Sequence, residues 1–183
     1  MPHYRRADTP GGTYFFTVVS YRRQPFLCDP DVRAALRQAI LNTRGIQPFT
    51  VEAWVLLPDH LHCIWTLPEG DADFAGRWAR IKRFVTKECR AYLHRNGLMH
   101  ASKERRKEST LWQRRYWEHL IRDPRDFRRH LDYLHFNPVK HGLVARVIDW
   151  PYSTFHRHLR RGVYAENWAG ESIRDTGNIR FGE

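Results

Sequence analysis

Two histidines separated by a single leucine, His60 and His62, directly follow a Pro58–Asp59 turn signal. The residues on both sides of this turn are apolar, which favours two β-strands joined by a tight turn. Alternate residues of a strand project from one face, so we expect the two imidazoles to lie together while Leu61 enters the core. Two imidazoles on one rigid strand can act as a pair of metal ligands. A His-x-His pair alone is weak evidence for such a site, because any half-buried strand can carry one.

A second group of polar side chains lies within residues 131–144, which read LDYLHFNPVKHGLV. Tyr133 and Asn137 are four residues apart, so on a helix they share one face and present a phenol beside an amide carbonyl. Two ordinary alternatives stay open: Tyr133 could pack its ring with the hydroxyl at the surface, and Asn137, which precedes a proline, could cap the helix end. His135 lies off this face and is not expected to be a ligand.

These two segments, together with WQRRYW at residues 112–117, resemble the motifs of the single-tyrosine HUH transposases, in particular those of bacterial REP-associated tyrosine transposases. The three motifs occur in the order in which that family carries them, and the resemblance extends from about residue 14 to residue 155. Three ordered motifs are far more specific than His-x-His alone. The resemblance therefore implies a fold, an activity and a set of site residues.

The resemblance implies a definite chemistry for the two motif segments. Tyr133 would attack a DNA phosphodiester and give a 5′-phosphotyrosine and a free 3′-OH, which the reverse step can rejoin. The metal ion, Mg²⁺ or Mn²⁺, would be held by His60, His62 and Asn137. Such an ion polarises the scissile phosphate and stabilises the charge that builds up on it. Because the hydroxyl of tyrosine ordinarily has a pKa of about 10, a nearby metal or base must help to remove its proton.

The positive charge of the chain is concentrated in one block. The formal net charge is +11, and residues 77–130 alone contain 17 Lys and Arg against 6 Asp and Glu, a difference of +11. A solvated basic face is the ordinary explanation, but such a block favours a polyanionic partner, with nucleic acid ahead of a membrane surface. The resemblance implies single-stranded DNA with a hairpin from a repetitive extragenic palindrome (REP). We expect phosphate contacts from Arg77, Arg80, Lys82, Arg83, Lys87, Arg114 and Arg115.

Composition excludes several other classes of protein. The three cysteines, Cys28, Cys63 and Cys89, form no Cys-x-x-Cys pair, which argues against a zinc ribbon or a disulfide scaffold and fits a reducing compartment. Cys63 would also point away from the His60–His62 face. No stretch approaches the roughly 20 apolar residues of a membrane helix, and no signal peptide is recognisable. We therefore expect a cytoplasmic protein that does not bind a membrane.

The element pattern predicts an α+β fold of the ferredoxin-like split β-α-β type, with an antiparallel sheet and helices on one face. Strands are expected at 13–22, 49–57, 60–67 and 111–121, the last also being compatible with a helix, and helices at 30–45, 73–95 and 124–137, with a mobile loop at 99–110. Pro138 should close or bend the last of these helices.

The domain organisation follows from the same pattern. Residues 1–12 are expected to be an N-terminal arm, residues 13–160 a catalytic domain, and residues 161–183 a loosely structured C-terminal tail. Two other functions remain open: a non-catalytic DNA-binding or regulatory relative of the transposases, and an RNA-binding ferredoxin-like module. The sequence is compatible with a monomer and with a homodimer.

Overall fold

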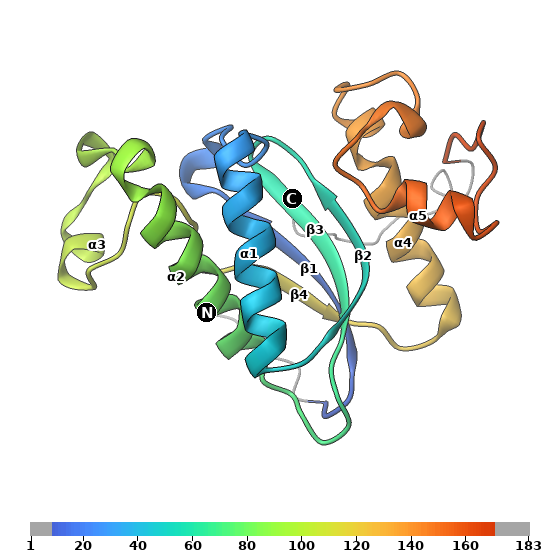
Figure 1. Ribbon diagram of the computed structural model, residues 1–183, viewed down its shortest axis with the longest axis horizontal. Coiled ribbons are helices and arrows are strands. Elements are labelled where there is room, and N and C mark those ends of the chain that lie inside the picture. Colours follow the sequence, from blue (N-terminus) through green and yellow to red (C-terminus); the bar gives the residue numbers. More distant parts are fainter. Residues whose placement is uncertain (1–8, 171–183) are drawn as a thin grey trace, which may run out of the picture.

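The computed structural model describes residues 9–170 and shows a four-stranded antiparallel sheet in the order β2-β3-β1-β4 (Figure 1). The strands are β1 (Thr13–Val19), β2 (Thr50–Leu56), β3 (His60–Thr66) and β4 (Trp117–Leu120). Helix α1 (Pro30–Ile46) connects β1 to β2, and α2 (Phe74–Leu93) lies between β3 and β4. This order is the ferredoxin-like split β-α-β arrangement, so the predicted α+β fold class is confirmed.

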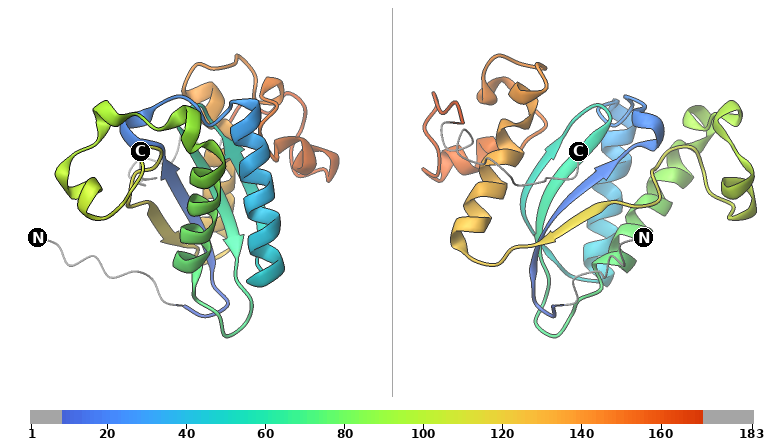
Figure 2. Two further views of the ribbon diagram at one scale, coloured as in Figure 1. Left: turned by 60° about the vertical axis from the view of Figure 1, so that its left-hand side comes forward. Right: turned by 180° about the vertical axis from the view of Figure 1, so that it is seen from behind.

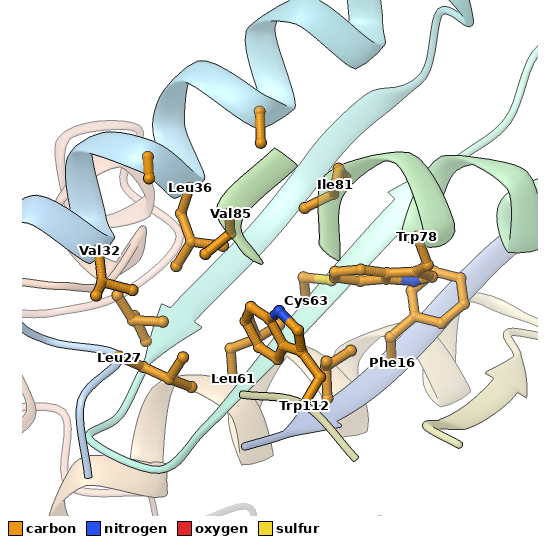
Figure 3. Packing of buried hydrophobic residues seen from close by; sticks show 14 of the residues in the cluster. Phe16, Leu27, Val32, Leu36, Leu61, Cys63, Trp78, Ile81, Val85 and Trp112 are labelled. Atoms are coloured by element: carbon orange, nitrogen blue, oxygen red, sulfur yellow. The ribbon is translucent and has the colours of Figure 1, made fainter. Parts of the chain in front are cut away.

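One face of the sheet packs against α1 and α2. Every second residue of β1, beginning with Tyr14 and Phe16, enters this core, as the two-residue period of a strand requires. On the neighbouring strand β3, Leu61 and Cys63 point into the same core, where Figure 3 shows them beside side chains of both helices. The two histidines of β3 therefore project from the opposite face.

The opposite face is also covered, which corrects the prediction that helices lie on one face alone. Helix α4 (Pro124–Lys140) and the short α5 (Phe155–Arg160) pack there, on the other side of the sheet from α1 and α2 (Figure 2). The physical reason lies in the central strands. From Tyr14 onward every residue of β1 is buried, so this strand is covered on both sides.

Two element boundaries differ from the sequence-based expectation. The fourth strand is limited to four residues, and the preceding segment joins the sheet through a single bridge between Ser20 and Trp112. The predicted mobile loop contains a short helix, α3 (Ala101–Arg105). Its Lys103 is buried, donates to the carbonyl of Ser109 (2.9 Å) and lies 4.1 Å from the ring centroid of Tyr21. These contacts order the segment despite its polar composition.

Pro138 does not close the last long helix, which excludes one of the two outcomes expected for it, closing or bending. Helix α4 continues through Pro138 to Lys140 and ends before Gly142, whose φ of 67° is the left-handed conformation that suits glycine. A proline one turn from a helix end removes a single backbone hydrogen bond, which the packing of the rest of the helix can offset. The continued last turn keeps Lys140 in helical register with Tyr133.

The two predicted terminal segments are only partly covered by the described residues. Residues 1–8 and 171–183 lie outside them. The start of the predicted loose tail is in fact packed: Tyr164 is buried, and its hydroxyl donates to Asp132 of α4 (2.7 Å). The end of the predicted arm is tied down as well, because the amide of Gly11 donates to the carbonyl of Asp71 (2.9 Å). Within residues 9–170, no helix is long and apolar enough to cross a membrane.

Candidate functional site

The predicted site residues converge in one chain, where α4 crosses the end of β3. His60 and His62 project toward α4 with their ring centroids 5.0 Å apart. The amide oxygen Oδ1 of Asn137 lies 3.3 Å from Nε2 of His60, and the ring of Tyr133 lies 5.4 Å from that of His62. All four side chains are buried. The structure therefore brings a phenol, two imidazoles and an amide oxygen into one cluster.

Neighbouring residues fix the orientation of both imidazoles. Nδ1 of His60 donates to the carboxylate of Asp59 at 2.6 Å, because a carboxylate can only accept. Nδ1 of His62 is bonded to the hydroxyl of Thr17 at 2.9 Å, through the antiparallel pairing of β1 with β3. Each histidine therefore uses Nδ1 within the protein, and Nε2 is the nitrogen that would bind a metal.

Asp59 is itself held in its charged form. Burial alone would raise the pKa of this carboxyl, but hydrogen bonds from His60 and Arg23 outweigh burial and lower the pKa from 3.8 to about 2. Arg23 donates to the second carboxylate oxygen at 3.0 Å. Arg22 and Arg23 both have φ values in the left-handed region, 55° and 52°. A costly turn conformation thus presents the arginine to Asp59.

The donor set fits a hard or borderline divalent cation. Two neighbouring ligands of an ion with bonds of about 2.1 Å lie about 3 Å apart, which is close to the 3.3 Å between Nε2 of His60 and Oδ1 of Asn137. Two imidazoles and one amide oxygen also leave coordination positions for phosphate and water. His60, His62 and Asn137 therefore have the chemistry and the proximity needed to hold Mg²⁺ or Mn²⁺.

Two further residues belong to the cluster and were not predicted. The ammonium group of Lys140 donates to the hydroxyl of Tyr133 at 3.0 Å and lies 4.9 Å from the centroid of its ring. The ring of His141 lies 5.1 Å from that of His60. The spacing of Tyr133, Asn137 and Lys140, at positions i, i+4 and i+7, could have identified the lysine, had the helix been continued through Pro138.

A separate group of titratable side chains joins β4 to the start of α4. Reactive atoms of His119, Asp126 and His130 lie within 4.8 Å of one another, close enough to suggest a metal site. The contacts instead indicate a structural hydrogen-bond network that holds the start of α4 against β4. Asp126 accepts from Nε2 of His119 (2.8 Å) and from the backbone of Arg122 (3.0 Å), and the two imidazoles stack at 4.4 Å with nearly parallel rings. Stacked rings do not direct their lone pairs at one ion.

The predicted DNA-binding residues form an exposed basic surface along α2 and the segment before β4. Its exposed members are Arg80, Arg83, Lys87, Arg114 and Arg115, and Lys82 is half-buried. Lys82, Arg83 and Arg114 line one cavity of about 480 Å³ between α2 and residues 107–114, with Trp112 in its wall. Arg114 is paired there with Glu108 (2.6 Å). The two sequence-distant parts of the basic block therefore meet at one place.

Arg77 has to be removed from this predicted DNA-binding set. Its side chain is fully buried and donates to both carboxylate oxygens of Asp71, at 3.0 and 2.6 Å. It also donates to the backbone carbonyls of Pro48 and Asp73. The guanidinium holds the pKa of Asp71 below its ordinary value. Arg77 thus joins α2 to the loops around it and has no surface left for phosphate.

Comparison with known proteins points to one family. No protein-family model matches the chain. The chain is 47% identical over 171 residues to the REP-associated tyrosine transposase of Escherichia coli (strain K12), with 93% of each protein covered. It is 44% identical over 177 residues to a relative from Haemophilus influenzae (strain ATCC 51907 / DSM 11121 / KW20 / Rd), with 93% of this chain and 94% of that protein covered. A solved REP-associated tyrosine transposase bound to a REP hairpin matches with a TM-score of 0.81 and 46% identity, covering 100% of this chain and 98% of that one.

Proposed function

The chain belongs to the family of REP-associated tyrosine transposases, and on that premise we propose that it is a metal-dependent endonuclease and strand transferase acting on single-stranded DNA. The observation that carries the proposal is the convergence of Tyr133 with His60, His62 and Asn137 within a single chain. Tyr133 and the two histidines are about 70 residues apart in the sequence, yet the rings of Tyr133 and His62 lie 5.4 Å apart. A packing tyrosine or a helix-capping asparagine would not require the histidines to be there.

Each residue has a defined part in the proposed reaction. Tyr133 attacks the scissile phosphorus, so that a bond forms between its oxygen and phosphorus and the bond to the 3′ oxygen breaks. His60, His62 and Asn137 hold the cation, which when bound supplies charge stabilisation on the phosphate. Asp59 and Thr17 keep the two imidazoles turned with Nε2 toward that position. The resulting 5′-phosphotyrosine keeps the energy of the broken bond, so a 3′-OH can reverse the step.

The proposed substrate is a single strand that carries a REP-type hairpin. A relative of known structure is bound to such a hairpin, and this chain matches it over its whole length. The exposed basic residues of α2 and of the segment before β4 provide a surface for the DNA backbone.

We also propose that the protein works in the cytoplasm, where its DNA substrate is located and where its three free thiols would remain reduced.

The decisive experiment is covalent trapping on a hairpin-bearing oligonucleotide in Mn²⁺. Wild-type protein should form a protein–DNA adduct that survives a denaturing gel, and Tyr133→Phe should bind the hairpin equally well and form no adduct. His60→Ala and His62→Ala should abolish cleavage while leaving most of the binding. An adduct that persists in Tyr133→Phe would refute the assignment of the nucleophile. Binding without cleavage by the wild type would favour a regulatory DNA-binding protein, and preference for RNA in competition would favour an RNA-binding module.

A further inference from the structure

The ammonium group of Lys140 contacts the atom that the proposed reaction uses as nucleophile. It donates a hydrogen bond of 3.0 Å to the hydroxyl of Tyr133, and it lies 4.9 Å from the centroid of the same ring. We propose that Lys140 is a catalytic residue that stabilises the phenolate form of Tyr133, both when it attacks and when it leaves. This inference rests on the proposed function, since it assigns a role in the same strand-transfer step.

The geometry follows from the course of α4. Seven residues correspond to nearly two turns of helix, so positions 133 and 140 lie on one face with Asn137 between them. This register exists because α4 continues through Pro138 instead of ending there. Lys140 is exposed, whereas the Tyr133 side chain is buried. The long lysine side chain extends from the surface, so that its charged end group reaches the hydroxyl of Tyr133.

A cation at this distance acts differently on the two protonation states of the phenol. A hydrogen bond to the oxygen is stronger when the oxygen is negatively charged, so the ammonium favours phenolate over phenol. In the forward step the Tyr133 proton passes to solvent, the phenolate oxygen bonds to phosphorus, and the departing 3′ oxygen takes a proton from solvent. In the reverse step a 3′-OH loses its proton to solvent and attacks phosphorus, and the bond between phosphorus and the Tyr133 oxygen breaks. The departing phenolate accepts the hydrogen bond from Lys140 and then takes up a proton from solvent.

The alternative is a structural role at the end of a helix. A lysine in the last turn also interacts favourably with the helix dipole, whatever lies beside it. That role would be visible as a change in stability and would not alter how adduct formation depends on pH. The ring of His62 on β3 also faces Tyr133, with the ring centroids 5.4 Å apart, and is unchanged in every Lys140 variant. The difference in pH dependence between these variants and wild type therefore separates the two roles.

The test measures the rate of adduct formation between pH 6 and pH 10 on a hairpin-bearing single strand with Mn²⁺. Lys140→Met should slow the reaction at neutral pH by about 100-fold, the usual effect of removing one donor from a developing charge. The difference in rate between Lys140→Met and wild type should become smaller as the pH rises, because hydroxide then removes the Tyr133 proton without the ammonium group. Lys140→Arg keeps a cation and should retain most of the rate. Arg37→Met, which removes an exposed cation from α1 on the other side of the sheet, is the matched control and should behave as wild type.

A modified tyrosine and a modified oligonucleotide show which of the two reacting oxygens is affected by the loss of Lys140. In the Lys140→Met background, 3,5-difluorotyrosine at position 133 has a more acidic hydroxyl and should restore the rate at neutral pH. An oligonucleotide with sulfur in place of the scissile 3′ oxygen has a better leaving group and should restore little. The reverse pattern would place Lys140 at the leaving group and overturn the proposal, as would a Lys140→Met protein with wild-type rate and pH dependence. If wild-type protein forms no adduct at all, the proposed function itself fails and this inference with it.

Discussion

At the scale of single residues, the proposed metal affinity depends on groups that never touch the ion. Asp59 holds Nδ1 of His60, and Thr17 holds Nδ1 of His62. Such partners fix the ring orientation and increase the basicity of the coordinating nitrogen. Because the pKa of Asp59 is about 2, this carboxylate stays charged down to strongly acidic pH. Its support of His60 should therefore be constant over the whole range in which the enzyme works.

We predict that Asp59→Ala weakens Mn²⁺ binding by about 10- to 100-fold, the usual cost of losing a partner of a ligating histidine. Asp59→Asn keeps an acceptor oxygen and should lose less. Titration of Mn²⁺ followed by electron paramagnetic resonance gives the affinity directly, without relying on activity. Asp149→Asn, which alters an exposed carboxylate paired with Arg146, is the control. Equal affinities for Asp59→Ala and wild type would show that His60 needs no such support.

The buried imidazole of His130 leads to a second prediction at this scale, on how the free energy of unfolding depends on pH. Burial, reinforced by the nearby His119, lowers the pKa of this imidazole from 6.5 to about 4. Above pH 6.5 both the folded and the unfolded chain hold it neutral. As the pH falls from 6.5 to 4, only the unfolded chain takes up the proton, so the free energy of unfolding should fall, by up to about 3 kcal/mol from this residue. Below the folded pKa the loss is complete.

Urea denaturation at pH 7.5 and pH 4.5 measures this difference. His130→Gln should show a smaller loss of stability between the two pH values than wild type, whatever its absolute stability. The exposed His100 provides a control substitution, His100→Gln, which should keep the wild-type difference. The same difference in His130→Gln and wild type would mean that His130 does not contribute.

The spacing of residues along the sequence correctly predicted which side chains share a face, both on strand β3 and on helix α4. His60 and His62 follow the two-residue period of a strand, and Tyr133 and Asn137 follow the four-residue spacing of a helix. The groups that orient them were not predictable in this way. Thr17 reaches His62 only through the register of β1 against β3, which no local pattern specifies.

At the scale of elements, α2 shows why a basic residue in a sequence is not yet a DNA contact. Arg77 and Arg80 lie one turn apart on the same helix, yet the first is fully buried and the second is exposed. The difference arises because the loop carboxylate of Asp71 and three backbone carbonyls accept hydrogen bonds from Arg77. These partners come from segments that the helical period does not describe.

We predict opposite phenotypes for the two arginines. Arg77→Met should lower the free energy of unfolding by about 3 kcal/mol, because charged hydrogen bonds are lost and carbonyls are left unpaired. Arg80→Met should change stability by less than about 0.5 kcal/mol, but should reduce the slope of log K against log salt by about 1 for hairpin binding. Urea denaturation and binding measured at several salt concentrations test both. A salt slope that falls for Arg77→Met and not for Arg80→Met would contradict the assignment.

Element boundaries were predictable where a local signal is strong. An aspartate followed by proline marks the start of both α1 and α4, and both helices begin at that proline. The end of α4 was not predictable, because tertiary packing on the sheet overrides the local preference of Pro138. The ordered segment around α3 was missed for a similar reason, since its stability comes from the buried Lys103.

At the scale of the whole molecule, the proposed nucleophile and the two histidines lie together within one chain. His60 comes from β3 and Tyr133 from α4, and no second copy is needed to bring them together. The sequence left this question open, because a tyrosine supplied by a partner chain would leave the same motifs. The distance between two elements far apart in sequence is a tertiary quantity that only the structure supplies.

We predict that the site works within one chain. A mixture of His60→Ala and Tyr133→Phe should form no covalent adduct, since each molecule lacks one half of its own site. Adduct formation by wild-type protein should rise in proportion to protein concentration, without a second-order phase. Separate samples of each variant and of wild type at the same total concentration are the controls. Recovery of adduct in the mixture would show that tyrosine and histidines are exchanged between chains.

The proposed active site is divided between α4 and β3, so it depends on how the helix packs against the sheet. The two histidines lie on β3, whereas Tyr133, Asn137 and Lys140 all lie on α4. Leu131 and Leu134 of α4 belong to one buried apolar cluster with Ile64 of β3, and this packing helps to hold the helix on the sheet. A displacement of α4 by a fraction of a helical turn would separate Asn137 from the two histidines, and so separate the proposed metal ligands, without changing any side chain. The packing of α4 on the sheet therefore determines whether the proposed nucleophile and the proposed metal ligands lie together.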